Sequence, residues 1–257
     1  DLGHKETTRS GRRQVGNRPV DRIRRGRLAK TLHRLPGLPV AMPIIERTKR
    51  EKELAALLAL ALGSLGASVD AGRPDYARFT EQATSAFSQT LTNVYVDAAN
   101  ALAGSQNVEI DQEAEAAAAI YITSVAPTLA RGMAQNTAAA LARRPLAPGA
   151  ASTSFLFSPG RAVSASITEV TRTGSQADRI AARTIGARLA VRTVGIWQTA
   201  RDDLVCPICR PLHGRPELGP NGWASRVPGG SPAHIGCRCE IVYRFEPLAG
   251  RLAGPRI

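Results

Sequence analysis

The sequence has few aromatic residues, few cysteines and no apolar run long enough to cross a membrane. Phenylalanine, tryptophan and tyrosine make up 4% of its 257 residues, so alanine and aliphatic side chains must fill most of any core. The longest apolar run, residues 54–62, is far shorter than the roughly 20 residues of a membrane span, and we expect no membrane contact. Four cysteines are too few for a small secreted disulfide scaffold, which predicts synthesis in a reducing compartment.

The whole chain carries a net charge of +13. Much of this charge lies near the N-terminus, where acidic residues are scarce. Residues 1–35 hold eleven lysines and arginines against three acidic residues, a net +8. Residues 1–43 contain four prolines and no helical or strand period, so we expect a basic, partly disordered arm. Dense arginine suits phosphate. We predict sequence-independent binding of double-stranded DNA, with a solvated tail as the alternative, through Arg9, Arg12, Arg13, Arg18, Arg22, Arg24, Arg25, Arg27 and Lys30.

The alanine-rich middle of the chain predicts long helices within residues 44–144. The first helix has a charged N-terminal half and an apolar C-terminal half, and it should end at Gly63 and Gly66. The second, residues 75–103, carries an apolar stripe at spacings of three and four. The third, residues 111–144, opens with acidic residues and should be kinked or split at an internal proline. These helices would form a helical domain or stalk, with stripes that serve as core faces or as seams between copies.

A stretch rich in proline, glycine and small residues, 145–160, is the predicted linker to a C-terminal domain, 161–257. There we expect a helix over 162–187, broken or bent at an internal glycine. Alternating patterns then predict two strands that pair with each other, 188–200 and 239–245. The predicted fold class is therefore mainly α with a small C-terminal α+β domain, in which short antiparallel strands lie around a cysteine-rich knuckle.

All four cysteines lie in two short segments, DDLVCPICRPLHG (202–214) and SPAHIGCRCE (231–240). A tetrahedral Zn²⁺ prefers sulfur-rich ligand sets, and Cys-x2-Cys places two thiols on one tight turn. We predict a structural zinc ion held by Cys206, Cys209, Cys237 and Cys239, with His234 as the alternative fourth ligand and His213 as a weaker candidate.

Two alternatives to zinc stay open: disulfides between the two segments, and reduced thiols packed without a metal. The residues between the segments are rich in glycine and proline, so we expect this loop not to fold by burial alone. Closing its two ends would lower the entropy that it retains.

The signatures of catalytic zinc are missing from the sequence. It contains neither the His-x-Glu of the base deaminases nor the His-Glu-x2-His of a metalloprotease helix. Four sulfur ligands would leave no position on the zinc ion for a reacting water. We therefore expect that the protein is not an enzyme. One alternative is a zinc-dependent nuclease or DNA-delivered effector. Its metal-activated water would be supplied by residues near the cysteines: Asp202, Asp203, Glu240, His213 and His234. A DNA-binding regulator is less favoured, because no basic recognition helix follows the cysteines.

The two cysteine segments and the residues around them resemble the C-terminal signature of the phage Mu F-like minor head proteins, or phage head morphogenesis proteins. The resemblance covers residues 161–245. Ile235-Gly236 replaces the Pro-Asn that is usual in the family. The upstream helix SITEVTRTGSQADRIAA (166–182) is similar to the family helix that carries a Thr-Glu pair. The other matching residues are Trp197, Asp202, Asp203, Cys206, Cys209, Leu212, Gly214, His234, Cys237, Arg238 and Cys239.

This resemblance implies a virion protein, made in the host cytoplasm and located inside the capsid in few copies. Its implied partners are the portal protein and the major capsid or scaffold protein, and its implied role is in head assembly, DNA packaging or ejection. An arginine-rich arm is consistent with surroundings of densely packed DNA. Arg179 and Arg183 lie one turn apart on the predicted helix. They could add a second contact with DNA or the portal, or only keep that helix soluble.

Overall fold

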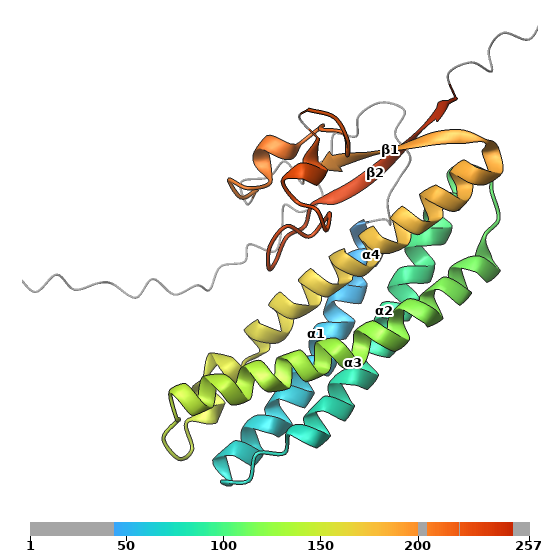
Figure 1. Cartoon of the computed structure of the whole chain (residues 1–257). Helices are drawn as coiled ribbons and strands as arrows, with labels where there is room; N and C mark the ends of the chain where they lie inside the picture. Colours follow the sequence, from blue (N-terminus) through green and yellow to red (C-terminus); the bar gives the residue numbers. More distant parts are fainter. Residues whose placement is uncertain (1–43, 200–204, 221, 249–257) are drawn as a thin grey trace, which may run out of the picture. The chain divides into compact units, whose positions relative to one another are not determined.

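The computed structural model describes residues 44–199, 205–220 and 222–248 (Figure 1). The predicted basic arm with its nine candidate DNA-binding residues, and also Asp202 and Asp203, lie outside the described residues. The described part of the chain is mainly helical, with four α-helices and one two-stranded antiparallel sheet near the C-terminus. The predicted fold class is confirmed.

The four helices run through residues 44–189, and all of them contribute buried residues to one hydrophobic core. They are α1 (Ile44–Asp70), α2 (Tyr76–Gly104), α3 (Asp111–Arg143) and α4 (Pro159–Leu189). In Figure 1, α1, α2 and α4 lie side by side, and α3 packs mainly along α2. The helix predicted over 75–103 is confirmed almost to the residue, because its apolar stripe is the buried face of α2.

Helix α1 does not end at Gly63 and Gly66, as the sequence suggested, but continues to Asp70. Gly66 instead allows close packing, because a Cβ atom there would lie 3.1 Å from Cγ of Phe157. The left-handed residue after the helix is Gly72, with φ of 71°, a conformation that favours glycine. Gly66 therefore serves the packing of Phe157 inside the helix, which a local pattern does not reveal.

Helix α3 also continues where the sequence predicted an interruption, because it runs unbroken through Pro127. Most of its buried residues are alanines spaced by four, on both sides of the proline: Ala114, Ala118, Ala126, Ala130 and Ala134. Small side chains let two helices approach closely, and this packing outweighs the loss of one backbone hydrogen bond. Helix α4 likewise contains Gly174 without a break.

The segment predicted as a linker, residues 145–160, joins α3 to α4 and packs against α1. It contains two turns of 3-10 helix, η1 (Ala151–Thr153) and η2 (Phe155–Phe157). The amide of Ala151 donates to a carboxylate oxygen of Asp70 at 3.1 Å. Arg161, in the first turn of α4, donates to the hydroxyl of Thr137 at 2.8 Å and to the carbonyl of Leu156 at 2.7 Å. This segment therefore forms a packed corner.

The sheet consists of β1 (Val191–Gln198) and β2 (Glu240–Pro247), which pair antiparallel as predicted. Trp197 lies opposite Ile241, and Gln198 lies opposite Glu240. The connection between the strands consequently leaves and re-enters the sheet at the same end, and we call its described residues, 205–220 and 222–239, the long loop. Both cysteine segments belong to this loop.

One described helical segment, Glu46–Asp70, is long and apolar enough to cross a membrane by length and composition. Its fully or almost fully buried side chains include Leu54, Leu58, Leu62 and Leu65, which belong to the hydrophobic core. A core helix of a soluble protein passes the same test, so this finding alone assigns no membrane contact.

The packing of α3 predicts opposite results for two neighbouring alanines. Ala118 is fully buried, whereas Ala119 is exposed. Ala118→Leu should lower the free energy of unfolding by about 1–3 kcal/mol, because the larger side chain must force the helices apart. Ala119→Leu is the matched control, with a change below about 0.5 kcal/mol. Chemical denaturation followed by circular dichroism measures both. Equal stabilities would contradict packing through this stripe.

Candidate metal centre

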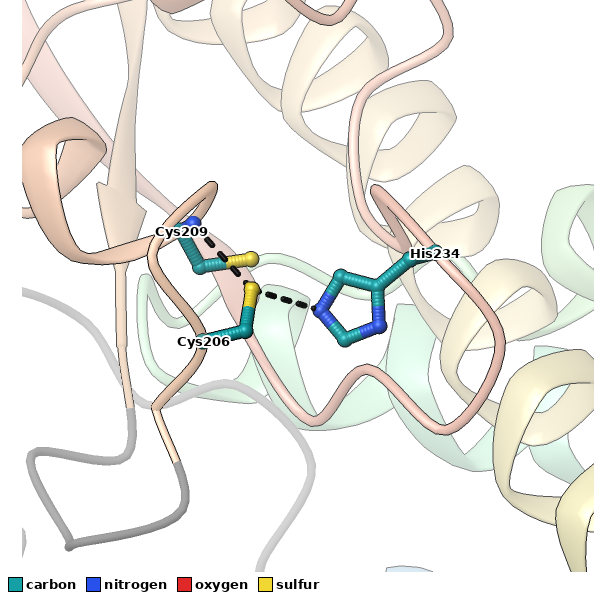
Figure 2. A group of neighbouring side chains, drawn as sticks. All are labelled: Cys206, Cys209 and His234. Atoms are coloured by element: carbon teal, nitrogen blue, oxygen red, sulfur yellow. Dashed lines mark hydrogen bonds between the residues drawn. The ribbon is translucent and has the colours of Figure 1, made fainter.

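The first cysteine segment forms a tight turn directed by backbone hydrogen bonds. The amide of Cys209 donates to the carbonyl of Cys206 at 3.2 Å and lies 3.3 Å from its sulfur. The amide of Arg210 donates to the same carbonyl at 3.0 Å. The chain then enters a short 3-10 helix, η3 (Arg210–Leu212), whose Leu212 is buried. Figure 2 shows the sulfur atoms of Cys206 and Cys209 close together.

The second segment forms a turn that carries His234, Cys237 and Cys239. The amide of Cys237 donates to the carbonyl of His234 at 3.1 Å. Gly236 has a φ of 74°, in the left-handed region that glycine and asparagine tolerate best. Glycine at position 236 therefore meets a conformational requirement of this turn. Ser231 donates to the carbonyl of Cys239 and so fixes the start of β2.

These two turns meet and bring together all five residues that the sequence named as ligands. The sulfur of Cys206 lies 3.0 Å from Nε2 of His234, and the sulfurs of Cys209 and Cys237 are 3.8 Å apart (Figure 2 shows the first contact). Two groups have all their donor atoms within 4.8 Å: Cys206, Cys209 and His234, and Cys209, Cys237 and Cys239. Cys209 belongs to both. These cysteine and histidine side chains could therefore bind a metal ion.

All four cysteines are free thiols, so no disulfide joins the two segments. His213 belongs to neither of the two ligand groups in the described residues. Its Nδ1 atom accepts from the amide of Thr199 at 3.1 Å, which ties η3 to the residue after β1. Its role in the described structure is to position the loop.

Hydrogen bonds and burial shift the pKa values of the buried thiols in different directions. Burial, followed by the neighbouring Cys237, raises the pKa of Cys209. The hydrogen bond with Cys239 lowers the pKa of Cys237, while the same contact raises the pKa of Cys239. Once one thiol of this group has ionised, the next proton is harder to remove. A metal ion removes this conflict, because its charge favours several thiolates at once.

The half-buried pair of the cluster, Cys206 and His234, is polarised in a different way. Burial opposes ionisation of Cys206, but hydrogen bonds from Cys209 and Ile208 together with the charge of His234 outweigh it and lower the pKa of Cys206. The hydrogen bond between the His234 ring and the carbonyl of Ile235 raises the pKa of His234. The ring nitrogen of His234 that faces Cys206 is Nε2. These two residues thus attract each other without a metal.

Two threonines of α4 form hydrogen bonds with the backbone of the second turn. The amide of Gly236 donates to the hydroxyl of Thr168 at 2.9 Å, and the hydroxyl of Thr171 lies 3.0 Å from the carbonyl of Cys237. Threonines spaced by three residues lie on one face of a helix. They hold consecutive backbone groups of the turn that carries Cys237.

Sequence reasoning did not identify this supporting role. The resemblance includes a Thr-Glu pair, Thr168-Glu169, but Glu169 does not join the cysteine cluster. Its carboxylate pairs with Arg172 at 2.7 Å, and burial raises its pKa although Arg172 opposes the shift. No local pattern singles out Thr171, whose partner is 66 residues away.

The long loop also contributes buried side chains to the hydrophobic core, which its composition did not predict. Trp223, within the loop, and Trp197, on β1, are both fully buried, with ring centroids 5.7 Å apart. The indole nitrogen of Trp223 donates to the carbonyl of Gly195 at 3.1 Å. A Cβ atom at position 195 would lie 3.0 Å from Ile241, so glycine allows Ile241 to pack close to the β1 backbone. Burial of Trp223 therefore helps order the loop.

The two arginines predicted to share a face of α4 have different environments. Arg183 is exposed. Arg179 is half-buried, and its guanidinium packs so closely on Gly230 that a Cβ atom there would lie 2.6 Å away. Burial raises the pKa of Tyr243, and the neighbouring Arg179 opposes this shift. Arg179 is thus part of the interface between α4 and the loop, while Arg183 stays available for an external contact.

Comparisons with protein-family models, curated proteins and solved structures find no match for this chain. The resemblance to the Mu F-like minor head proteins therefore stays a prediction, carried by the two cysteine segments and the helix that precedes them.

The shared position of Cys209 predicts that it dominates metal binding. We expect one divalent metal ion per chain, and Cys209→Ser should lower the affinity more than about 100-fold, beyond the range for supporting residues. Ile208→Ser changes an exposed neighbour on the same turn and should bind normally. Metal content after gel filtration and chelator competition measure both. A wild-type protein that takes up no metal, or a Cys209→Ser variant of unchanged affinity, contradicts the site.

Proposed function

We propose that this protein is a minor capsid protein of a phage head, in which a structural zinc knuckle orders the C-terminal domain. The observation that carries the proposal is the meeting of Cys-x2-Cys with His-x2-Cys-x-Cys at one end of a two-stranded sheet. These are the segments by which the sequence resembles the Mu F-like minor head proteins. Head assembly, DNA packaging or ejection is the proposed context.

The sulfur geometry supports zinc as the metal. Two thiolates at ~2.3 Å from one tetrahedral zinc ion lie ~3.8 Å apart, and the sulfurs of Cys209 and Cys237 are separated by 3.8 Å. A disulfide would require ~2.05 Å. A sulfur and an imidazole nitrogen on the same ion lie about 3.6 Å apart. Cys206 and His234, at 3.0 Å, would have to separate by about half an ångström.

The arrangement of donors supports a structural role over a catalytic one. Cys209, Cys237 and Cys239 are at most 5% exposed, and the described residues offer five donors for the four positions of a tetrahedral ion. A catalytic zinc ion keeps one position for water or substrate. We therefore infer that the protein is not an enzyme. Plasmid cleavage with Mg²⁺ or Zn²⁺ that is lost in His234→Ala would instead support the zinc nuclease.

The remaining parts of the proposal concern partners. The arginine-rich residues 1–35 would bind packaged double-stranded DNA through phosphate, independently of sequence. The portal protein, and the major capsid or scaffold protein, would be the protein partners inside the capsid. This division gives the knuckle a structural task and leaves DNA binding to the arm.

The assignment to a phage head is tested with the portal protein encoded in the same genome. Co-expression should give a complex in which this chain elutes with the ring-shaped portal at a size far above its own 27.2 kDa. The chain should also be present, in few copies, in purified particles. Elution at its own size together with absence from particles would contradict the proposal.

The arm predicts a steep salt dependence of DNA binding. Each phosphate that the arm neutralises contributes about −0.9 to the slope of log affinity against log salt. Replacing the nine candidate arm residues by glutamine should make the slope shallower by about 0.9 for every phosphate that is no longer neutralised. A matched variant with the eight arginines changed to lysine keeps the charge and should retain most of the slope. Fluorescence anisotropy with two unrelated duplexes measures it. Equal slopes for wild type and the glutamine variant would exclude the arm as the DNA-binding segment.

A further inference from the structure

A chain of side-chain contacts connects the cysteine cluster with the first turn of α1. The hydroxyl of Thr171 on α4 lies between two carbonyls, that of Ile167 one turn earlier at 2.7 Å and that of Cys237 at 3.0 Å. The same oxygen accepts a hydrogen bond from the guanidinium of Arg47 on α1. Thr171 is 3% exposed, so these contacts are shielded from water and cannot be exchanged cheaply for solvent.

Arg47 uses its guanidinium to join three elements. Nε donates to Glu51 of its own helix at 3.1 Å, Nη2 donates to Thr171 of α4, and Nη1 reaches the carbonyl of Arg238 at 3.4 Å. Its side chain is only 14% exposed. The planar fork of arginine can bond several acceptors in fixed directions, whereas a lysine ammonium acts as a point charge. This geometry explains the residue type at position 47.

The acceptors at the far end of this chain are backbone groups of the metal-binding turn. The carbonyls of residues 237 and 238, together with the Gly236 amide held by Thr168, define the backbone on both sides of the Cys237 sulfur. Residues that orient ligands without touching the metal typically contribute 10–100-fold to metal affinity. Arg47 and Thr171 occupy that position, although they lie far away in the sequence.

We propose that Arg47 and Thr171 are positioning residues of the metal centre, and that metal binding in turn fixes the first turn of α1, where the basic arm meets the helical body. The inference rests on the proposed zinc site. Coupling between two sites is reciprocal: if Arg47 improves the fit of Cys237 to the ion, the ion stabilises the hydrogen bonds of Arg47. The first turn of α1 and the zinc knuckle thereby form one linked unit.

The experiment uses the full chain and zinc, with cobalt as a spectroscopic probe. Arg47→Gln and Thr171→Val should each weaken zinc binding about 10–100-fold in chelator competition and alter the cobalt–thiolate absorption bands. Arg47→Lys should weaken it as well, because it keeps the charge but not the fork. In the wild type, zinc should slow hydrogen exchange of the amides of residues 44–55.

Arg50→Gln is the matched control, one turn away on the same helix. Arg50 pairs with Asp97 of α2 at 2.8 Å and with Glu53 at 3.1 Å. Its loss should lower stability and leave zinc affinity unchanged. If Arg47→Gln does not fold, Thr171→Val and the exchange measurement on the wild type still decide.

The possible failures of the two proposals are distinguishable. A wild-type protein that takes up no zinc overturns the proposed zinc site and this inference with it. Normal zinc uptake combined with unchanged affinity in Arg47→Gln and Thr171→Val overturns only the inference. Exchange of residues 44–55 that is insensitive to zinc does the same.

Discussion

The antiparallel register of β1 and β2 determines where every other functional feature lies. Gln198 pairs with Glu240, so the residues that follow β1 and those that precede β2 start from the same end of the sheet. This places Cys206 and Cys209 within reach of the segment that holds His234, Cys237 and Cys239. A shift of the register by one residue would separate Trp197 from Ile241, which are both buried and lie opposite each other. The register is thus fixed by burial, and the cysteine cluster depends on it.

Closure of the long loop therefore has several independent causes. The buried contact of Trp223 with Trp197 and the hydrogen bond of Trp223 to Gly195 hold the middle of the loop on the sheet. Thr168 and Thr171 hold its second turn on α4. A metal ion bound there would join two turns that these contacts already bring close, so the entropy that it would have to overcome is small. The same contacts also explain how the cysteines can meet as free thiols, without a disulfide.

The parts of the fold that the sequence predicts are those governed by local periodicity. The stripe of α2 reports burial of one face, which is a property of neighbouring residues. The alternation of β1 and β2 identified two strands, although consecutive residues such as Ile196 and Trp197 are buried there. The ends and interruptions of helices depend on distant partners instead. Gly66 lies inside α1 because Phe157 packs on it, and Pro127 lies inside α3 because alanines on both sides of it are buried. At the site, the ligands could be named from residue type and spacing. Their support by Thr171 and Arg47 could not, since these contacts span 66 and 124 residues.

Helix α4 connects these levels, because its N-terminal and C-terminal halves serve different parts of the molecule. Ala181 and Ile185 belong to the hydrophobic core that it shares with α1 and α2, while Thr168 and Thr171 contact the cysteine turn.

Asp178, also buried on α4, adds a constraint. Burial, and then the nearby Glu240, raise its pKa well above the ordinary value, and Arg47 opposes the shift. A buried carboxyl group of this kind keeps its proton at a pH where a surface aspartate is ionised. Above the pKa that Asp178 has in the unfolded chain, folding must therefore bind a proton or bury a charge, so stability falls as the pH rises from there towards the folded pKa. Arg47 thus has two neighbours on α4, Thr171 and Asp178, and a change in its position alters both the support of the cysteine turn and the electrostatics of the core beside it.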